Sequence, residues 1–224
     1  MFIDIYCERT GPELWSEPIN LISNGAFLIA AALLLRPWLR LYSGRLRQGW
    51  DRLLLILLLA AIGVGSGLWH LYAERWAMLA DVLPIAAFIS VFLLVFLVRV
   101  ARAPPLVAAA LFLLYHGVNA GVQALLPADF LNGSVFYLPT WATMVAMALW
   151  LATRAHGAWR HYAWAAGLFL ASLAFRTVDM ALCGLWPLGT HFLWHLLNAV
   201  LLYLLVDGLL RPGRGEGDMK HDAS

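Results

Sequence analysis

The chain has 224 residues, of which 62% are hydrophobic and only 12% carry a charged side chain. This composition excludes an ordinary water-soluble domain, in which about a quarter of the residues are charged, and it is typical of a protein that crosses a membrane several times. The formal net charge of +2 reflects the composition of the loops and implies no anionic partner such as a nucleic acid. We predict no protein partner from the sequence.

Residues 1–18 form an acidic segment without the basic and then apolar pattern of a signal peptide, so the first helix is expected to act as its own insertion signal. Seven apolar runs follow, each near the ~20 residues that a membrane-crossing helix needs. They lie at 19–37, 53–72, 78–98, 105–126, 135–153, 162–182 and 190–210. Residues 211–224 are expected to form a solvated, disordered tail. We therefore predict an all-α membrane protein whose single domain, 19–210, is a bundle of seven transmembrane helices.

The distribution of cations predicts how this bundle lies in the membrane, because cytoplasmic loops carry an excess of Lys and Arg. Of the 15 cations, 12 fall after the first, third and fifth helices and in the tail, and the other side holds only Arg9, Arg75 and Arg176. We expect the N-terminus outside and the C-terminus in the cytoplasm. The short loops, the Ala/Leu/Arg-rich composition and the absence of an organelle retention signal favour a bacterial inner membrane, with the outer end facing the periplasm.

Three histidines and an aspartate interrupt the apolar segments at spacings that suit a metal site. His70 lies near the outer end of the second helix with Ser66 one turn deeper, and Asp81 lies at a matching depth on the third helix. His191 and His195, four residues apart, are neighbours on one face of the seventh helix. Ionisable groups inside membrane segments are candidates for function because hydrocarbon penalises them.

Three imidazole ligands with an open fourth position are typical of catalytic zinc. The sequence therefore predicts a zinc site made by His70, His191 and His195, with Asp81 acting on a water. Alternatively, the paired histidines could bridge helices by hydrogen bonds or bind haem, and Ser66 could be a packing residue.

The same residues belong to an ordered set of short motifs. These are Asp4-x-Tyr6-Cys7-Glu8, Glu17-x2-Asn20-x3-Asn24, Gly65-Ser66-x3-His70, Asp81-x2-Pro84, Asp179-x3-Cys183 and His191-x3-His195. The set resembles the alkaline ceramidase family, part of a superfamily of seven-helix membrane hydrolases that includes the adiponectin receptors, and the resemblance runs from residue 4 to about residue 200. It implies a zinc-dependent amidase site made of Ser66, His70, Asp81, His191 and His195.

The resemblance also implies a calcium site in the N-terminal acidic segment, which would tie this segment to the first helix. Oxygen ligands for this hard cation could come from Asp4, the Tyr6 carbonyl, Glu8, Thr10 and Glu17. The family has Asp-Trp-Cys-Glu here, whereas this chain has one residue more between Asp4 and Cys7, so the choice of oxygens stays open. An acidic segment that needs no ion is the alternative.

Cys7 and Cys183 are the only two cysteines. The predicted topology places both on the outer side, where disulfides persist if the compartment is oxidising. The resemblance implies a disulfide between these two positions, and two free buried thiols are the alternative.

Further polar positions lie near the same end of the predicted bundle. His116, Asn119 and Gln123 share one face of the fourth helix, where they could line a substrate cavity or form a hydrogen-bonded seam between helices. Arg176 could pair with Asp179 or contact a polar head group. We include these residues as candidates for the substrate cavity.

These features predict a zinc-dependent intramembrane amidase that hydrolyses a ceramide-like N-acyl lipid to a fatty acid and an amine such as a sphingoid base. Zinc would lower the pKa of a water toward ~7 and polarise the amide carbonyl. Asp81 would act as general base, and Ser66 would orient the water or hydrogen-bond the oxyanion. The alternatives are a lipid receptor or sensor with structural zinc, which has less need of Asp81, and a proton or metal transporter, which the aliphatic inner helix halves argue against.

Overall fold

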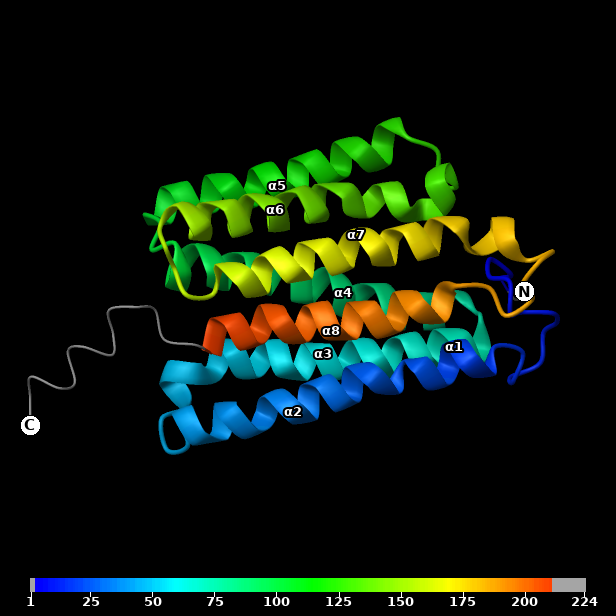
Figure 1. Cartoon of the computed structure of the whole chain (residues 1–224), viewed down its shortest axis with the longest axis horizontal. Helices are drawn as coiled ribbons and strands as arrows, with labels where there is room; N and C mark the ends of the chain where they lie inside the picture. The colour runs from blue at the N-terminus through cyan, green and yellow to red at the C-terminus, as the bar shows by residue number, and fades with distance from the viewer. Residues whose placement is uncertain (1–2, 211–224) are drawn as a thin grey trace, which may run out of the picture.

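Long runs of Leu, Ala, Val and Phe fold into helices here, because inside a membrane every backbone N–H and C=O group needs a partner within its own segment. The structure is a computed structural model that describes residues 3–210. Within that range the regular structure is entirely helical (Figure 1). The predicted tail, 211–224, lies outside the described residues.

The helices run back and forth along one long axis. In chain order they are α1 (Pro18–Ser23), α2 (Gly25–Tyr42), α3 (Leu46–Tyr72), α4 (Arg75–Val95), α5 (Pro105–Leu125), α6 (Leu138–Thr153), α7 (Trp159–Leu182) and α8 (His191–Leu210). A π-helical turn, η1 (Phe96–Val100), extends α4, and a 3₁₀-helical segment, η2 (Phe130–Tyr137), leads into α6.

Seven helical stretches in the described part of the chain are long and apolar enough to cross a membrane. They are Pro18–Tyr42, Leu46–Tyr72, Arg75–Val100, Pro105–Leu125, Phe130–Thr153, Trp159–Leu182 and His191–Leu210. This confirms the predicted seven-helix membrane fold. The second span begins at Leu46 rather than at 53, because its polar first turns, which hydropathy leaves out, are also helical.

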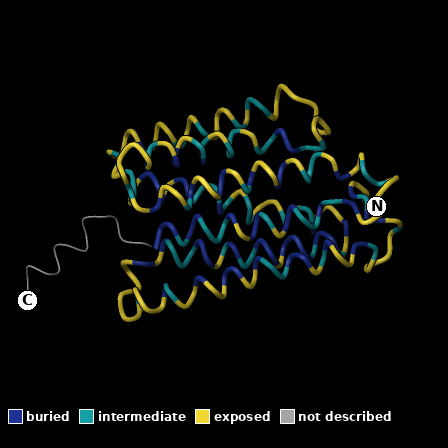
Figure 2. The backbone as a smooth tube through the Cα atoms, viewed as in Figure 1, coloured by how far each residue is buried: buried dark blue, intermediate teal, exposed yellow. Residues whose placement is uncertain are grey.

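The helices differ in how deeply they lie within the bundle. In the most apolar 18-residue stretch of each span, 50% of the residues are buried in α3 and 56% in α8, but only 6% in α5. Figure 1 shows α3 and α8 side by side with α2 along one edge, and α7, α6 and α5 following one another toward the opposite edge. Figure 2 shows the same contrast, with buried positions concentrated on α3 and α8 and an exposed α5. Side chains on α3 and α8 are therefore the best enclosed.

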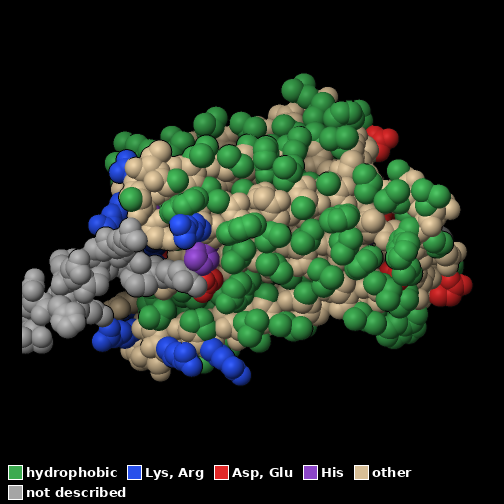
Figure 3. Space-filling view, viewed as in Figure 1, with side chains coloured by type: hydrophobic (Ala, Val, Ile, Leu, Met, Phe, Trp, Pro, Cys, Tyr) green, Lys and Arg blue, Asp and Glu red, His purple; other side chains and the backbone are tan. Residues whose placement is uncertain are grey.

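The two ends of the bundle differ in charge. We call the end that carries residues 3–17, where α3 stops and α8 starts, the N-terminal end, and the opposite end the C-terminal end. On the face drawn in Figure 3, Lys and Arg gather at the C-terminal end, most acidic side chains lie at the N-terminal end, and hydrophobic side chains cover the surface between them. This separation matches the pattern of charges read from the sequence.

Candidate metal centre

The three predicted histidines meet at the N-terminal end of the bundle. His70 comes from the last turn of α3, and His191 and His195 come from the first two turns of α8. All three are enclosed, with exposed fractions of 1%, 2% and 1% in that order. One ligand atom from each lies within 4.8 Å of the others. The structure therefore brings together the set that the sequence offered as metal ligands.

The spacing of the imidazoles fits a shared ion. Nε2 of His70 and Nε2 of His195 are 3.1 Å apart. Two nitrogens bound at 2.0–2.1 Å to one tetrahedral zinc are roughly 3.3–3.4 Å apart, so this separation needs little adjustment. Nδ1 of His191 is buried and has no hydrogen-bond partner among the described residues. The three imidazoles could therefore hold one metal ion, and their spacing is compatible with tetrahedral zinc.

Side chains at the start of the first span and just before it contact Nδ1 of two of these histidines, His195 and His70. Oγ of Ser23 donates to the carbonyl of Asn20 (2.8 Å) and lies 2.7 Å from Nδ1 of His195. Because the hydroxyl proton is already used, the protonated Nδ1 of His195 donates to Ser23 and leaves Nε2 as the free acceptor. Such partners fix the orientation of metal-binding histidines.

Glu17 holds His70 in the same manner. Oε2 of Glu17 lies 2.5 Å from Nδ1 of His70, and Oε1 pairs with the guanidinium of Arg9. Burial opposes the charged carboxylate of Glu17, but the contacts with His70 and Arg9 hold its pKa below the usual value. With Nδ1 donated to this carboxylate, His70 presents Nε2 to the same point as His195.

Ser66 and Asp81 lie beside the histidines, where α3 and α4 approach closely. A Cβ atom on Gly65 would stand 1.9 Å from the carbonyl oxygen of Ala80, so only glycine permits this approach. It allows Ser66 and Asp81 to interact, and Asp81 also interacts electrostatically with His70. Oδ1 of Asp81 is buried without a hydrogen-bond partner among the described residues, so it is free to accept a proton or a hydrogen bond.

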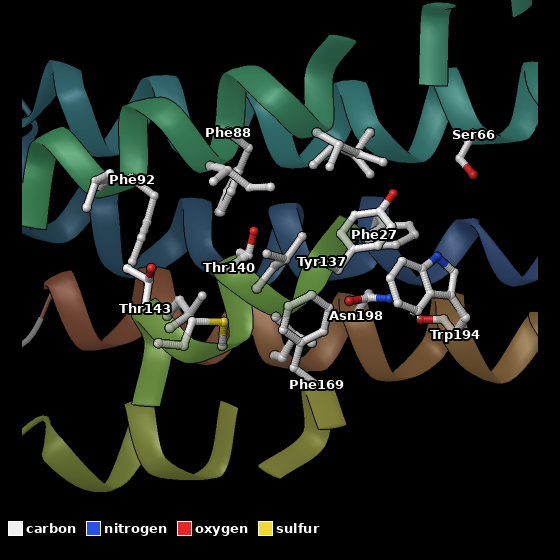
Figure 4. Close-up of a pocket in the computed structure, with 18 of the residues that line it drawn as sticks. Phe27, Ser66, Phe88, Phe92, Tyr137, Thr140, Thr143, Phe169, Trp194 and Asn198 are labelled. Carbon is white, nitrogen blue, oxygen red and sulfur yellow. Dashed lines mark hydrogen bonds between the residues drawn. The ribbon is translucent and has the colours of Figure 1, made fainter. Parts of the chain in front are cut away.

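An apolar cavity leads from this cluster into the bundle. Ser66, Asp81 and His195 line one part of it, and the remaining lining is mostly apolar. Figure 4 shows Ser66 and Trp194 toward one end, Phe92 and Thr143 toward the other, and side chains from several helices directed into the space between. This apolar lining suits a hydrocarbon chain better than a polar ligand.

The polar residues of the fourth span are not among those that line this cavity, and Nε2 of His116 lies 3.4 Å from Oγ of Ser90 on α4, as in the alternative of a hydrogen-bonded seam between helices. His116 and Gln123 are exposed, and Asn119 donates to the carbonyl of Tyr115 (2.8 Å). α5 turns Tyr115 inward instead, and its hydroxyl lies 2.8 Å from Oγ1 of Thr140. The rotation of α5 follows from its packing, which the spacing of polar residues does not reveal.

Arg176 also lies outside the lining of the cavity. Its guanidinium stands 5.2 Å from the ring centre of Trp194 and 5.7 Å from that of Tyr137, and both of these rings line the cavity. No ion pair joins Arg176 to Asp179 within the described chain. The guanidinium therefore packs behind the aromatic wall of the cavity.

Asp179 instead fixes the start of α8. Its Oδ1 accepts from the backbone N–H groups of Thr190 (2.6 Å) and His191 (2.9 Å), and its Oδ2 accepts from that of Cys7 (3.2 Å). Gly189, with φ +63°, leaves room for this carboxylate, because a Cβ there would stand 2.2 Å from Oδ1. The motif residue Asp179 thus positions the first histidine of α8 and anchors the N-terminal segment.

The two cysteines lie at disulfide distance beside this anchor, with an S–S distance of 1.97 Å and a Cα–Cα distance of 5.2 Å between Cys7 and Cys183. Next to them, the ring of Tyr6 stacks on His191 with 3.9 Å between ring centres. Burial raises the pKa of the Tyr6 phenol to about 12, so the ring stays neutral. The N-terminal segment therefore covers the histidine cluster.

Residues offered as calcium ligands occupy different environments. Asp4 and Thr10 are exposed, whereas Tyr6, Glu8 and Glu17 are buried. Sequence reasoning assigned no role to Arg9 or Ser23, and their partners lie elsewhere in the chain. The role of Arg9 could have been suspected only because it is a basic residue inside an acidic segment. Nothing in the sequence pointed to the role of Ser23.

Fold and site together define a seven-helix membrane protein with a buried three-histidine cluster at the head of an apolar cavity. Its sequence matches no protein-family model and no curated protein. The likeness to alkaline ceramidases rests on the motif residues alone.

Proposed function

We propose that this protein is a zinc-dependent membrane hydrolase that cleaves the amide bond of a ceramide-like N-acyl lipid and releases a fatty acid and a free amine. The observation that carries the proposal is the position of Asp81 and Ser66 beside three buried histidines at the head of an apolar cavity. This combination would place metal ligands, a proton acceptor and an apolar lining for a hydrocarbon chain together. The resemblance of the motifs to alkaline ceramidases points the same way.

His70, His191 and His195 would hold the zinc through imidazole nitrogens. When bound, zinc lowers the pKa of a coordinated water toward ~7 and polarises a carbonyl oxygen. Asp81, whose Oδ1 has no partner within the described chain, would accept the proton of the attacking water and pass it to the nitrogen of the leaving amine. The acyl carbon gains a bond to the water oxygen and loses its bond to that nitrogen.

Ser66 would act next to Asp81 as a hydrogen-bond donor to the reacting groups. Its hydroxyl interacts with Asp81 and would donate a hydrogen bond to the oxyanion or orient the water. A buried donor of this kind stabilises developing charge best where water is excluded. The lining of the cavity meets that condition, because it is mainly apolar.

The acyl chain would extend from the site into the apolar cavity, past Phe88 and Phe92. The head group would remain near the N-terminal end, where Trp194 and Tyr137 form a wall backed by Arg176. The separation of charges between the two ends (Figure 3) supports an N-terminal end outside the cytoplasm. In a bacterial inner membrane the site would face the periplasm.

The test is fatty-acid release from a panel of N-acyl lipids, ceramides included, by the purified protein, with zinc content measured on the same samples. We expect the wild type to bind about one zinc and release fatty acid, and His191→Ala to lose both. His116→Ala is the matched control, because His116 is exposed on α5 and its loss should change neither. Bound zinc without release from any lipid in the panel would contradict the proposal and favour a receptor with structural zinc.

A further inference from the structure

A buried arginine connects the N-terminal segment to the body of the bundle. Arg9 is 4% exposed, and all three nitrogens of its guanidinium have partners. Nε pairs with Oε1 of Glu17, Nη1 donates to the carbonyl of Gly11 (3.1 Å), and Nη2 donates to the carbonyl of His70 (2.8 Å). One side chain thus joins the segment, the start of the first span and the end of α3.

The two buried carboxylates of this segment, Glu8 and Glu17, both accept hydrogen bonds from other groups of the chain. The oxygens of Glu8 accept from the backbone N–H groups of Ile19 (2.7 Å) and Asn20 (2.8 Å). Oε2 of Glu17 accepts from the side-chain amide of Asn20 (3.1 Å) and lies 2.5 Å from Nδ1 of His70. Every oxygen of both carboxylates therefore has a donor from the protein.

This arrangement does not fit the calcium ion that the family resemblance implies for the segment. Calcium takes six to eight oxygen ligands, but the oxygens of Glu8 and Glu17 already accept from donors of the protein. The buried oxygens of the adjoining first span that have no partner within the described chain are Oδ1 of Asn20 and Oδ1 of Asn24, far fewer than that coordination number. A guanidinium already supplies positive charge beside Glu17. Bringing a divalent cation to the same carboxylate would place like charges together in a buried environment, where they are poorly screened.

We propose that the guanidinium of Arg9 serves as an internal cation in place of calcium, so that the N-terminal segment closes over the histidine cluster without a bound ion. The clip is built into the chain and is present at any calcium concentration. Arg9 also holds Glu17 against Nδ1 of His70, which makes it a positioning residue for that histidine. The docking of the segment does not rest on the proposed hydrolase activity, whereas the positioning of His70 rests on the proposed zinc site, so stability and zinc retention are measured separately below.

The first test measures calcium dependence in the full-length protein purified in detergent. Thermal unfolding, followed by tryptophan fluorescence, is recorded with calcium chloride and with EGTA while free zinc is held constant. We expect the same midpoint temperature, Tm, in both conditions, and no saturable calcium binding by equilibrium dialysis with radioactive calcium. A saturable rise in Tm with calcium, or about one bound calcium per chain, would overturn the proposal.

The second test removes the internal cation. Arg9→Gln keeps neutral donors but removes the charge beside Glu17, and Arg75→Gln is the matched control because Arg75 is exposed at the same end of the bundle. We expect Arg9→Gln to lower Tm by about 5 °C or more, since breaking a buried ion pair is strongly destabilising, and to weaken zinc retention against a competing chelator. Arg9→Lys should recover part of both losses, and Arg75→Gln should change neither.

Two outcomes of this second test bear on the proposal directly. An Arg9→Gln protein as stable as the wild type would show that the guanidinium is not the clip. If Arg9→Lys loses as much stability and zinc retention as Arg9→Gln, the positive charge at position 9 is not what holds the segment. If Arg9→Gln fails to fold, the calcium measurement on the wild type still decides the question.

Discussion

The two halves of the bundle are stabilised by different means. Toward the C-terminal end, Leu34, Leu55, Leu59 and Val206 are fully buried and contact other apolar side chains. Toward the N-terminal end, the buried residues include many polar ones, namely Glu8, Arg9, Glu17, Asn20, Ser23, Asn24, Ser66, His70, Asp179, His191 and His195. The apolar half depends on close packing, and the polar half depends on specific partners.

This difference shows which half can carry chemistry. Between membrane helices, packing supplies much of the attraction, and any side chain of suitable shape contributes to it. A buried polar group without a partner is costly. The polar half is therefore stabilised by hydrogen bonds and ion pairs between residues that lie far apart in the sequence. Ser23 and His195, for example, are 172 residues apart in sequence. Substitutions should therefore affect stability in one half and metal binding or turnover in the other.

The largest effect should follow Asp81→Asn. The amide cannot accept a proton as the carboxylate does, so we expect fatty-acid release to fall by ~10²–10⁴-fold, the usual contribution of a general base. Zinc content should stay at the wild-type level, because Asp81 is not one of the three histidine ligands. Full activity in this variant would remove the general-base role, and loss of zinc would make Asp81 part of the metal site.

Loss of the disulfide should come next in size. Replacing both Cys7 and Cys183 by Ser frees the N-terminal segment from the start of the last span, and removal of a native disulfide costs about 2–5 kcal/mol in small secreted domains. We expect a lower Tm that no longer responds to reducing agent, whereas the wild type should lose stability when reduced. An unchanged Tm would mean that the contacts of Asp179 and Arg9 hold the segment alone.

Leu59→Ala tests the apolar half. Leu59 is fully buried among apolar side chains of the core, and truncation of such a residue costs about 2–5 kcal/mol. The folded fraction of this variant should keep the zinc content and the turnover per zinc of the wild type. A drop in turnover per zinc would break the comparison, because it would show that packing at the C-terminal end controls the site.

Ser23→Ala should give the smallest of these effects, and it tests one contact, that of Ser23 with His195. It removes the hydroxyl that accepts from Nδ1 of His195, and loss of such a partner typically costs about 10–100-fold in metal affinity or activity. Competition with a zinc chelator measures the affinity. Ser90→Ala is the control, because Oγ of Ser90 donates to the carbonyl of Ala86 on the same helix (2.8 Å) and its neighbouring imidazole is that of His116 (3.4 Å to Nε2), which is not one of the three clustered histidines. Equal zinc affinity in the two variants would contradict the assigned role of Ser23.

The parts of the molecule that sequence reasoning predicted are those that depend on local pattern. Length and hydropathy define the seven spans, and the depth of each polar residue within its span was enough to group His70, Asp81 and His195. Arg9 and Ser23 were missed because their roles depend on contacts with residues far away in sequence. The two alternatives for His116, cavity lining or a seam between helices, could not be separated from the sequence for a similar reason, since the rotation of a peripheral helix is set by its neighbours.

The central claim is that three histidines from α3 and α8 hold a zinc ion, and zinc K-edge X-ray absorption on the purified protein tests it most directly. The account predicts about one zinc per chain with three nitrogen ligands at roughly 2.0–2.1 Å and one further light atom. In His191→Ala the zinc should be absent or lose a nitrogen ligand. A wild-type protein without zinc, or with sulfur in its coordination shell, would contradict the account.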